Sequence, residues 1–508
     1  MPESFWDVVV IGAGAAGLAA THAAGLAGAD VVLADKGLIG QGGATIMAQM
    51  TVAAALGSEE PDDWTGHYDD TVTGGRGLNV PALAEVLTRD APARIREVAE
   101  LGVKWARRPD GGIKQVTAPG HSRKRCVYVD FLSSGPSIVR ALKGAIRRRG
   151  RCTELKNVTV HRLLVADGRV AGALAVDVAT GARVVVRAGG VVLATGGCTR
   201  LFARSSACLN MTGDGHALAL RAGAELIDME FVQFFPIGTV HPHLIGLDPV
   251  MWDPFRYKLG GRLLNGRGEE FVEHYADDVG RYTALRDAAT YAILKEVEAG
   301  RGAPHGGVYL DFRGNTRERI REAFGGVVEI LERQGMDLTR QAVEVAPLAH
   351  YTIGGIRVNE RMETAVPGLY AAGEVAGGAH GANRLSGNAL TEALTFGARA
   401  GAGAAAHAVG RQRSDTTGSE AAATGSLDDL LARRGDTSPT AVREEIQRVM
   451  WSDVGPFRTT AGLDRALHRL EDLAARDPLA RADVGRRVAG VREPLGRVGE
   501  ALEQDIRD

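Results

Sequence analysis

The chain has 508 residues, of which 45% are hydrophobic and 67 are glycine, and its formal net charge is −2 at pH 7. This length exceeds that of one compact domain and predicts two or three domains. The near-neutral charge argues against a nucleic-acid-binding protein, because such proteins are usually basic. The composition is typical of an α/β enzyme with many tight turns.

A dinucleotide-binding pattern opens the chain. The valine-rich run at residues 7–11 predicts a strand that is buried on both faces of a parallel sheet. Gly12, Gly14 and Gly17 follow at the G-x-G-x-x-G spacing, and the predicted helix covers residues 14–27. The first glycine permits a tight turn, the second lets the backbone approach a pyrophosphate, and the third lets the helix pack closely on the strand.

The next segments continue an alternating strand and helix pattern. The apolar residues 31–34 end in Asp35, at the distance where an acidic side chain binds a ribose hydroxyl. Three short antiparallel strands are predicted at residues 157–165, 171–178 and 183–186, because Asp-Gly and Thr-Gly turns separate them.

Two later segments indicate which dinucleotide is bound. Residues 191–197 are an apolar run that ends in two glycines, and residues 369–374 are an apolar run that ends in Gly373 and Glu374; both resemble the return strands of FAD-binding proteins. This resemblance favours FAD over NAD. It implies that Glu374 holds the ribityl or ribose hydroxyls.

Further motifs extend the resemblance over about residues 5–475. The motifs are residues 210–215, 228–234, 264–271, 350–356 and 380–384. Together they resemble the flavoprotein subunit of succinate dehydrogenase and fumarate reductase, in a superfamily that includes L-aspartate oxidase and thiol-linked fumarate reductases. The resemblance implies an α/β fold, with a Rossmann-like FAD-binding domain, an inserted α+β capping domain and a C-terminal helical segment.

The predicted organisation follows from the periodicity and the resemblance. Helices are expected at residues 287–299, 316–334 and 388–408. The predicted parts are an FAD-binding domain (1–240 and 348–410), a capping substrate domain (241–347), a Ser/Thr/Ala/Gly-rich linker (411–426) and a C-terminal helical domain (427–508).

The resemblance also implies a set of cofactor contacts. In the respiratory flavoproteins a histidine bonds the flavin covalently, but Ala44 stands at that position, so noncovalent FAD is expected. The predicted FAD-binding residues are Gly12, Gly14, Ala15, Ala16, Gly17, Asp35, Lys36, Gly43, Ala44, Thr45, Ala194, Thr195, Gly196, Asp214, Gly373, Glu374, Arg384, Ser386, Asn388 and Leu390. The four cysteines contain no C-x-x-C pair, and no metal site is predicted.

The resemblance implies a catalytic set as well. A bond next to a carboxylate is oxidised or reduced by hydride transfer at flavin N5, with a proton donor on the other face and fixed cations at the carboxylate. Arg286 is the expected proton donor or acceptor, and Asp253 and Arg256 are expected to relay protons to it. His350 and Arg384 are the expected carboxylate ligands.

The departures from the family pattern concern the other end of the substrate. The family has a histidine where this chain has Phe235, and Trp252 falls near a family threonine; Ile237 also replaces a polar residue. A buried carboxylate facing these apolar side chains would be costly. The expected substrate therefore has one carboxylate and a less charged far end. The candidates for a replacement cation are Arg313, Arg357 and Lys258.

Several alternatives stay open. One is succinate dehydrogenase, fumarate reductase or L-aspartate oxidase activity, and another is a flavin subunit that only relays electrons inside a larger complex. The expected partners are a small carboxylate and an electron-transfer partner, with neither nucleic acid nor direct membrane insertion, and oligomerisation is left open. The lack of a long apolar run and of a signal-peptide pattern predicts a cytoplasmic protein.

Overall fold

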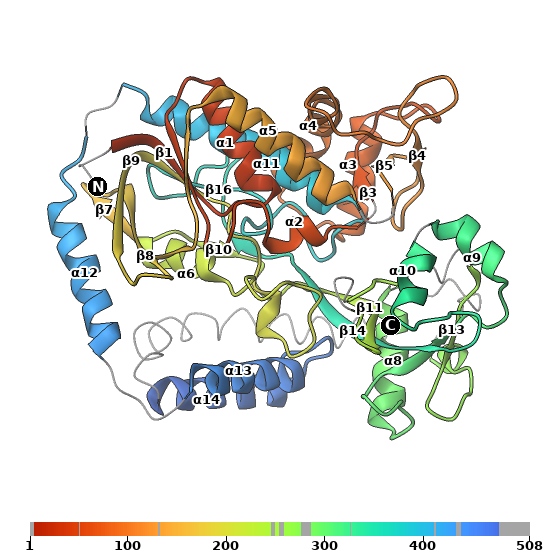
Figure 1. Cartoon of the computed structure of the whole chain (residues 1–508). Helices are drawn as coiled ribbons and strands as arrows, with labels where there is room; N and C mark the ends of the chain where they lie inside the picture. The colour runs from red at the N-terminus through yellow and green to blue at the C-terminus, as the bar shows by residue number, and fades with distance from the viewer. Residues whose placement is uncertain are drawn as a thin grey trace. The chain divides into compact units, whose positions relative to one another are not determined.

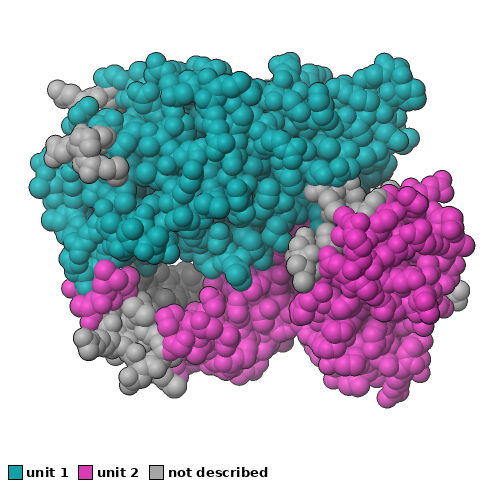
Figure 2. All heavy atoms as spheres, viewed as in Figure 1, with its two compact units in different colours: residues 1–199, 207–233, 351–428 teal, residues 200–206, 234–350, 429–508 magenta. Residues whose placement is uncertain are grey.

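The computed structural model describes residues 5–49, 51–130, 133–244, 249–252, 259–275, 286–325, 327–410, 413–432 and 438–476. The chain forms two compact units, which Figure 2 shows in teal and magenta. Unit 1 consists of residues 1–199, 207–233 and 351–428, and unit 2 consists of residues 200–206, 234–350 and 429–508. Each unit is assembled from three separate stretches of the chain.

A seven-stranded sheet forms the centre of unit 1 (Figure 1). Its strand order is β6-β2-β1-β9-β8-β7, and β16 pairs with β9 in addition. The strands are β1 (Phe5–Ile11), β2 (Val31–Ala34), β6 (Cys152–Leu155), β7 (Val158–Ala166), β8 (Arg169–Asp177), β9 (Arg183–Leu193) and β16 (Leu369–Ala371). The pairs β6-β2, β2-β1, β1-β9 and β9-β16 are parallel, as the buried valine-rich run of β1 predicts.

Strand β9 joins two kinds of pairing. Along residues 183–187 it pairs antiparallel with β8, which pairs antiparallel with β7. Along residues 191–193 it pairs parallel with both β1 and β16. The sequence predicts these two halves as separate strands, whereas the structure makes them one continuous strand.

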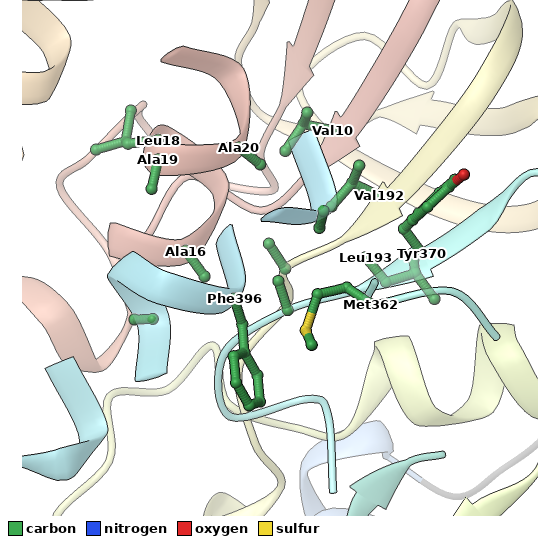
Figure 3. Close-up of a cluster of buried hydrophobic side chains, with 14 of the residues drawn as sticks. Val10, Ala16, Leu18, Ala19, Ala20, Val192, Leu193, Met362, Tyr370 and Phe396 are labelled. Carbon is green, nitrogen blue, oxygen red and sulfur yellow. The ribbon is translucent and has the colours of Figure 1, made fainter. Parts of the chain in front are cut away.

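Helices α1 (Ala15–Leu26) and α11 (Asn388–Ala408) pack together beside this sheet. Their contact faces carry small residues such as Ala16, Ala19 and Ala20, and these lie in the apolar cluster drawn in Figure 3 with Phe396. The predicted helix 388–408 has the same bounds as α11. The core of unit 1 thus links the beginning of the chain to residues more than 350 positions later.

The remaining elements of unit 1 surround this core. They include a three-stranded sheet in the order β3-β5-β4 and the short pair β10-β15. Their bounds are α2 (Gly43–Met47), β3 (Thr51–Ala53), α3 (Trp64–Gly74), α4 (Pro81–Glu100), β4 (Gln115–Val116), β5 (Cys126–Tyr128), α5 (Ser134–Arg149), α6 (Asp214–Ala222), β10 (Leu226–Ile227) and β15 (Gly355–Ile356).

The predicted linker 411–426 differs from the structure, because residues Thr417–Ala432 form helix α12. This helix is tied to the sheet by polar contacts. Arg187 of β9 makes two hydrogen bonds of 2.6 and 2.8 Å to Glu420, and Arg162 of β7 donates to Ser426. Docking of this kind stabilises a helix whose sequence has weak helical propensity.

Unit 2 is built on a four-stranded sheet in the order β11-β14-β13-β12. The strands β12-β13 and β13-β14 pair antiparallel. Its elements are β11 (Val232–His241), β12 (Arg262–Leu264), α8 (Arg286–Glu298), β13 (Val308–Asp311), α9 (Arg317–Phe324), α10 (Val327–Arg333), β14 (Val343–Thr352), α13 (Pro439–Asp453) and α14 (Thr460–Arg476), with short 3₁₀ turns at Thr199–Leu201 and Val272–His274.

Two helical predictions can be compared with unit 2. The predicted helix 287–299 corresponds to α8. The predicted helix 316–334 is divided into α9 and α10 at Gly325, whose φ of 57° is incompatible with a continuous right-handed helix. In the described part of the chain, no helix combines the length and the apolar character needed to cross a bilayer.

Candidate active site

The turn between β1 and α1 forms the phosphate-binding pattern predicted from the glycines. Gly12 has a φ of 104°, which favours glycine. A side-chain carbon on Gly17 would lie 1.8 Å from the Gly12 carbonyl oxygen, so the helix approaches the turn at glycine-only distance. Gly14 precedes α1 and offers no side-chain cap. The amides at the start of α1 are therefore candidate ligands for an anion.

Two side chains already hold the amides of this turn. Asp35, at the end of β2, accepts hydrogen bonds from the backbone N–H of Ala13 at 2.8 Å and of Gly37 at 2.7 Å. Thr45 Oγ1 accepts from the N–H of Ala15 at 2.9 Å. The predicted residues Asp35 and Thr45 thus meet at one end of α1, where the adenosine and diphosphate of a dinucleotide would be bound.

Further predicted residues follow β9 and β2 or belong to α6 and α2. Thr195 Oγ1 is buried and has no hydrogen-bond partner among the described residues, which leaves a polar group for a bound ligand. Lys36 and Asp214 contact each other, with 2.5 Å between Lys36 Nζ and Asp214 Oδ2. Ala44 is exposed. The residues present therefore fit FAD at this edge of the sheet.

Glu374 lies three residues after the end of β16. It is the residue predicted to bind the ribityl or ribose hydroxyls. Its carboxylate accepts a hydrogen bond from the Thr352 backbone N–H at 2.9 Å. Burial raises the pKa of Glu374 to about 8, although the backbone bond and Arg384 lower it. A protonated Glu374 can donate to an oxygen of the ligand, whereas the ionised form can only accept.

This pKa predicts how the FAD-free protein responds to pH. The folded protein keeps the proton up to about pH 8, whereas an unfolded glutamate loses it near its ordinary value of 4.5. The free energy of unfolding therefore falls as pH rises through this window, because the folded state binds more protons. We expect Glu374→Gln to flatten this fall, measured as the difference in melting temperature from wild type at about pH 5 and about pH 8. An equal pH response of the two proteins would contradict it.

Three further predicted residues lie at the start of α11 or just before it. Asn388 Oδ1 lies 2.8 Å from His67 Nε2, and Asn388 Nδ2 donates to Thr71 at 3.2 Å. The Ser386 carbonyl oxygen lies 2.7 Å from His121 Nε2, and Leu390 is buried. These contacts fix the first turn of α11, where the helix dipole favours negative charge.

Arg384 lies one turn ahead of α11 and is almost fully buried, with 5% exposed. Its Nη2 donates to Gln233 Oε1 at 2.8 Å. Gln233 Nε2 in turn donates to Asn383 Oδ1 and to the Arg384 carbonyl oxygen, both at 2.8 Å. Gln233 therefore fixes both the side chain and the backbone of Arg384. The family motif contained Gln233, but this contact joins positions 151 residues apart, which sequence spacing does not reveal.

Unit 2 contains the other predicted substrate residues. His350 Nδ1 lies 2.8 Å from Ser206 Oγ, and the His350 ring lies 5.5 Å from the Phe235 ring. Phe235, Ile237 and Trp252 are buried, with at most 2% exposed. Trp252 Nε1 donates to Thr239 Oγ1 at 2.9 Å, so its polar atom is bound inside the sheet. Phe235 is therefore a buried side chain whose ring packs against His350.

The predicted proton-transfer residues belong to α8 and to the segment before it. Arg286 is the first residue of α8. Asp253, Arg256 and the alternative cation Lys258 lie outside the described residues. Among the described residues, no group of three or more His, Cys, Asp or Glu side chains is arranged to hold a metal ion.

The chain is similar to known FAD proteins over most of its length. Residues 7–390 match the FAD binding domain family. One chain of the fumarate reductase (CoM/CoB) of Methanothermobacter marburgensis is 36% identical over 484 residues, which cover 94% of this chain and 86% of that protein. L-Aspartate oxidase of Streptomyces coelicolor is also 36% identical, with coverages of 92% and 80%. The E. coli quinol fumarate reductase structure has a TM-score of 0.85 at 29% identity and covers 93% of this chain and 83% of its own.

Proposed function

The chain belongs to the FAD-binding family of the succinate dehydrogenase and fumarate reductase flavoproteins and L-aspartate oxidase, and it is an FAD-dependent oxidoreductase. From this membership we propose that it oxidises or reduces a C–C or C–N bond next to a carboxylate. We further propose that the substrate carries one carboxylate and an uncharged far end, and that FAD is bound noncovalently.

The observation that carries the proposal is the burial of two apolar side chains on β11, Phe235 and Ile237. The Phe235 ring lies 5.5 Å from that of His350, which belongs to the neighbouring strand β14. Transfer of an unpaired carboxylate into such surroundings costs on the order of several kcal/mol. A second substrate carboxylate is therefore disfavoured, whereas an alkyl or aromatic group is favoured there.

The first carboxylate has candidate ligands. A guanidinium binds a carboxylate through two parallel hydrogen bonds, and Arg384 is buried and fixed by Gln233. We assign Arg384 and His350 to this carboxylate. Bound FAD would accept or donate a hydride at its N5 atom. Arg286 would take the proton from the adjacent carbon during oxidation or return it during reduction, with Asp253 and Arg256 relaying it.

A dicarboxylate reaction is the second candidate, because relatives at 36% identity are named fumarate reductase and L-aspartate oxidase. It would require a replacement cation. Two of the three alternatives already have partners: Arg313 makes hydrogen bonds of 2.9 and 3.2 Å to Asp311, and Arg357 lies 3.1 Å from Glu225. Because these two guanidinium groups are already paired with carboxylates of the protein, a monocarboxylate substrate is favoured.

Anaerobic bleaching of the flavin tests the proposal. The oxidised protein is mixed with saturated monocarboxylates and amino acids, and with succinate and aspartate as dicarboxylates. The reduced protein is mixed with crotonate and fumarate. Faster flavin reduction or reoxidation by monocarboxylates supports the proposal, and efficient turnover of succinate, fumarate or aspartate refutes it. Hydrogen peroxide formation during turnover distinguishes an oxidase from an enzyme that passes electrons to a partner.

The Phe235→His variant provides a gain-of-function prediction. An imidazole beside His350 would offer a donor to a second carboxylate, and a hydrogen bond to a charged group contributes about 1.5–3 kcal/mol. We expect the KM for fumarate to fall by about tenfold or more. Phe235→Leu is the matched control, since it changes the shape without adding a donor. A fumarate KM that is the same in both variants would argue against the role of Phe235.

A further inference from the structure

A buried polar network lies against Arg384 in unit 1. It consists of Tyr351 of β14, Glu392 of α11 and His380. The exposed fractions are 5% for Tyr351, 0% for Glu392 and 1% for His380. None of these three side chains has a role in the proposed reaction.

The Tyr351 ring supports the guanidinium group. The Arg384 guanidinium carbon lies 4.3 Å from the centre of the ring, which is the geometry of a cation–π contact. Arg384 Nη1 also donates to the Leu385 carbonyl oxygen at 3.1 Å. A planar guanidinium that is stacked on a ring and bonded at its edge has a defined orientation.

Glu392 binds the hydroxyl group of the same tyrosine. Its Oε2 accepts a hydrogen bond from the Tyr351 hydroxyl and lies 3.3 Å from His380 Nε2. One tyrosine thus contacts the cation through its ring face and the carboxylate through its hydroxyl group. Burial raises the pKa of Tyr351 well above its ordinary value, and Glu392 raises it further, while Arg384 lowers it. Both charges therefore act on the same group.

We propose that Tyr351 is a positioning residue for Arg384, and that Glu392 is a buried counter-charge that limits the positive potential Arg384 presents to an anion. Two buried charges of opposite sign reduce each other's effect on a third group. The inference rests on the proposed function, in which Arg384 binds the substrate carboxylate. It adds a reason for the strength of that binding.

Substitution of Glu392 and substitution of Tyr351 should change the anion affinity and the flavin midpoint potential in opposite directions. Glu392→Gln keeps the shape and an oxygen that accepts from Tyr351, but removes one negative charge. This variant leaves Arg384 less compensated, so an anion binds more tightly and the flavin midpoint potential rises. Tyr351→Leu removes the ring, so Arg384 is less well oriented, the anion binds more weakly and the potential falls. A purely structural role would shift both variants in the same direction.

The test uses the FAD-containing full chain and crotonate as the probe. Crotonate affinity is measured from the change in flavin absorption, and the midpoint potential by reductive titration. We expect crotonate to bind on the order of tenfold more tightly to Glu392→Gln, the effect of one unit charge at roughly 10 Å and an effective dielectric constant of about 20. We expect on the order of tenfold weaker binding to Tyr351→Leu, the effect of a desolvated cation–π contact.

Two controls separate this inference from destabilisation. Tyr370→Phe removes a buried tyrosine hydroxyl from β16 of the same unit and should change neither quantity. In an Arg384→Gln background, Tyr351→Leu should no longer change the midpoint potential, because the ring then orients no cation. Shifts of the same sign in the two single variants, or a Tyr351→Leu effect that persists without Arg384, would overturn the inference.

The outcome for the proposed function is separate. Failure of the wild-type protein to bind crotonate would count against the proposed function. The midpoint potentials would then decide the inference, because their predicted signs do not depend on any substrate. An unchanged potential in Arg384→Gln would overturn the inference itself.

Discussion

We expect Arg286→Gln to lower the rate of flavin reduction or reoxidation by substrate by about 10²- to 10⁴-fold, the usual contribution of a positioned acid or base. The variant should retain FAD, because Arg286 begins α8 of unit 2, whereas the FAD-binding turn belongs to unit 1. The measurement is anaerobic stopped-flow absorption of the flavin at saturating substrate, together with the FAD content of the purified variant.

The matched control for this variant is Arg317→Gln. Arg317 also belongs to unit 2 and makes hydrogen bonds of 2.5 and 2.7 Å to Glu332 on the surface. Its loss should leave the rate within about twofold, as expected for an exposed ion pair. If Arg286→Gln is as fast as wild type, the chain is better described as an electron-relaying component of a larger complex.

The second large effect concerns Gly17. We expect Gly17→Ala to bind FAD about tenfold to a hundredfold more weakly, because the new carbon would lie 1.8 Å from the Gly12 carbonyl oxygen. Relief of that overlap moves α1 away from the turn, and overpacking of this kind costs about 1–3 kcal/mol. Affinity is measured from the fluorescence of released FAD.

Gly418→Ala is the control for this variant. A side-chain carbon at Gly418, in α12, would meet no atom within 4 Å. This substitution should leave FAD affinity unchanged and raise the melting temperature slightly, because alanine favours the helix. Native FAD affinity in Gly17→Ala would mean that the β1–α1 turn does not hold the cofactor tightly.

The local predictions that succeeded concern elements whose own sequence determines them. The β1–α1–β2 segment has a buried apolar run, spaced glycines and a second apolar run, and the observed bounds differ from the predicted ones by at most two residues. The predictions that failed depend on distant contacts. Gly189 and Gly190 separate the two halves of β9 in the sequence, yet they lie against Ala408 and Ala404 of α11, where larger side chains would not fit.

The candidate site shows the same difference between residues found from a local motif and contacts that depend on distant segments. Arg384 was predicted because it lies in a dense local motif. Gln233, Tyr351 and Glu392, which surround it, come from three separate segments, and their contacts with Arg384 or with each other depend on how these segments fold together. The composition of residues 411–426 likewise predicts a linker, because the sequence does not show that Arg187 and Arg162 hold this segment as a helix.

The pairing of β16 with β9 also determines when unit 1 can be completed during synthesis. Residues 369–371 join residues 191–193, and the stretch 234–350 of unit 2 is synthesised between them. A nascent chain that has not yet released α11 from the ribosome leaves the small-residue face of α1 uncovered. Contacts of such large sequence separation slow folding and prolong the exposure of apolar surface. We therefore expect fragments that end before residue 388 to aggregate, and expression to benefit from slower translation or added chaperones.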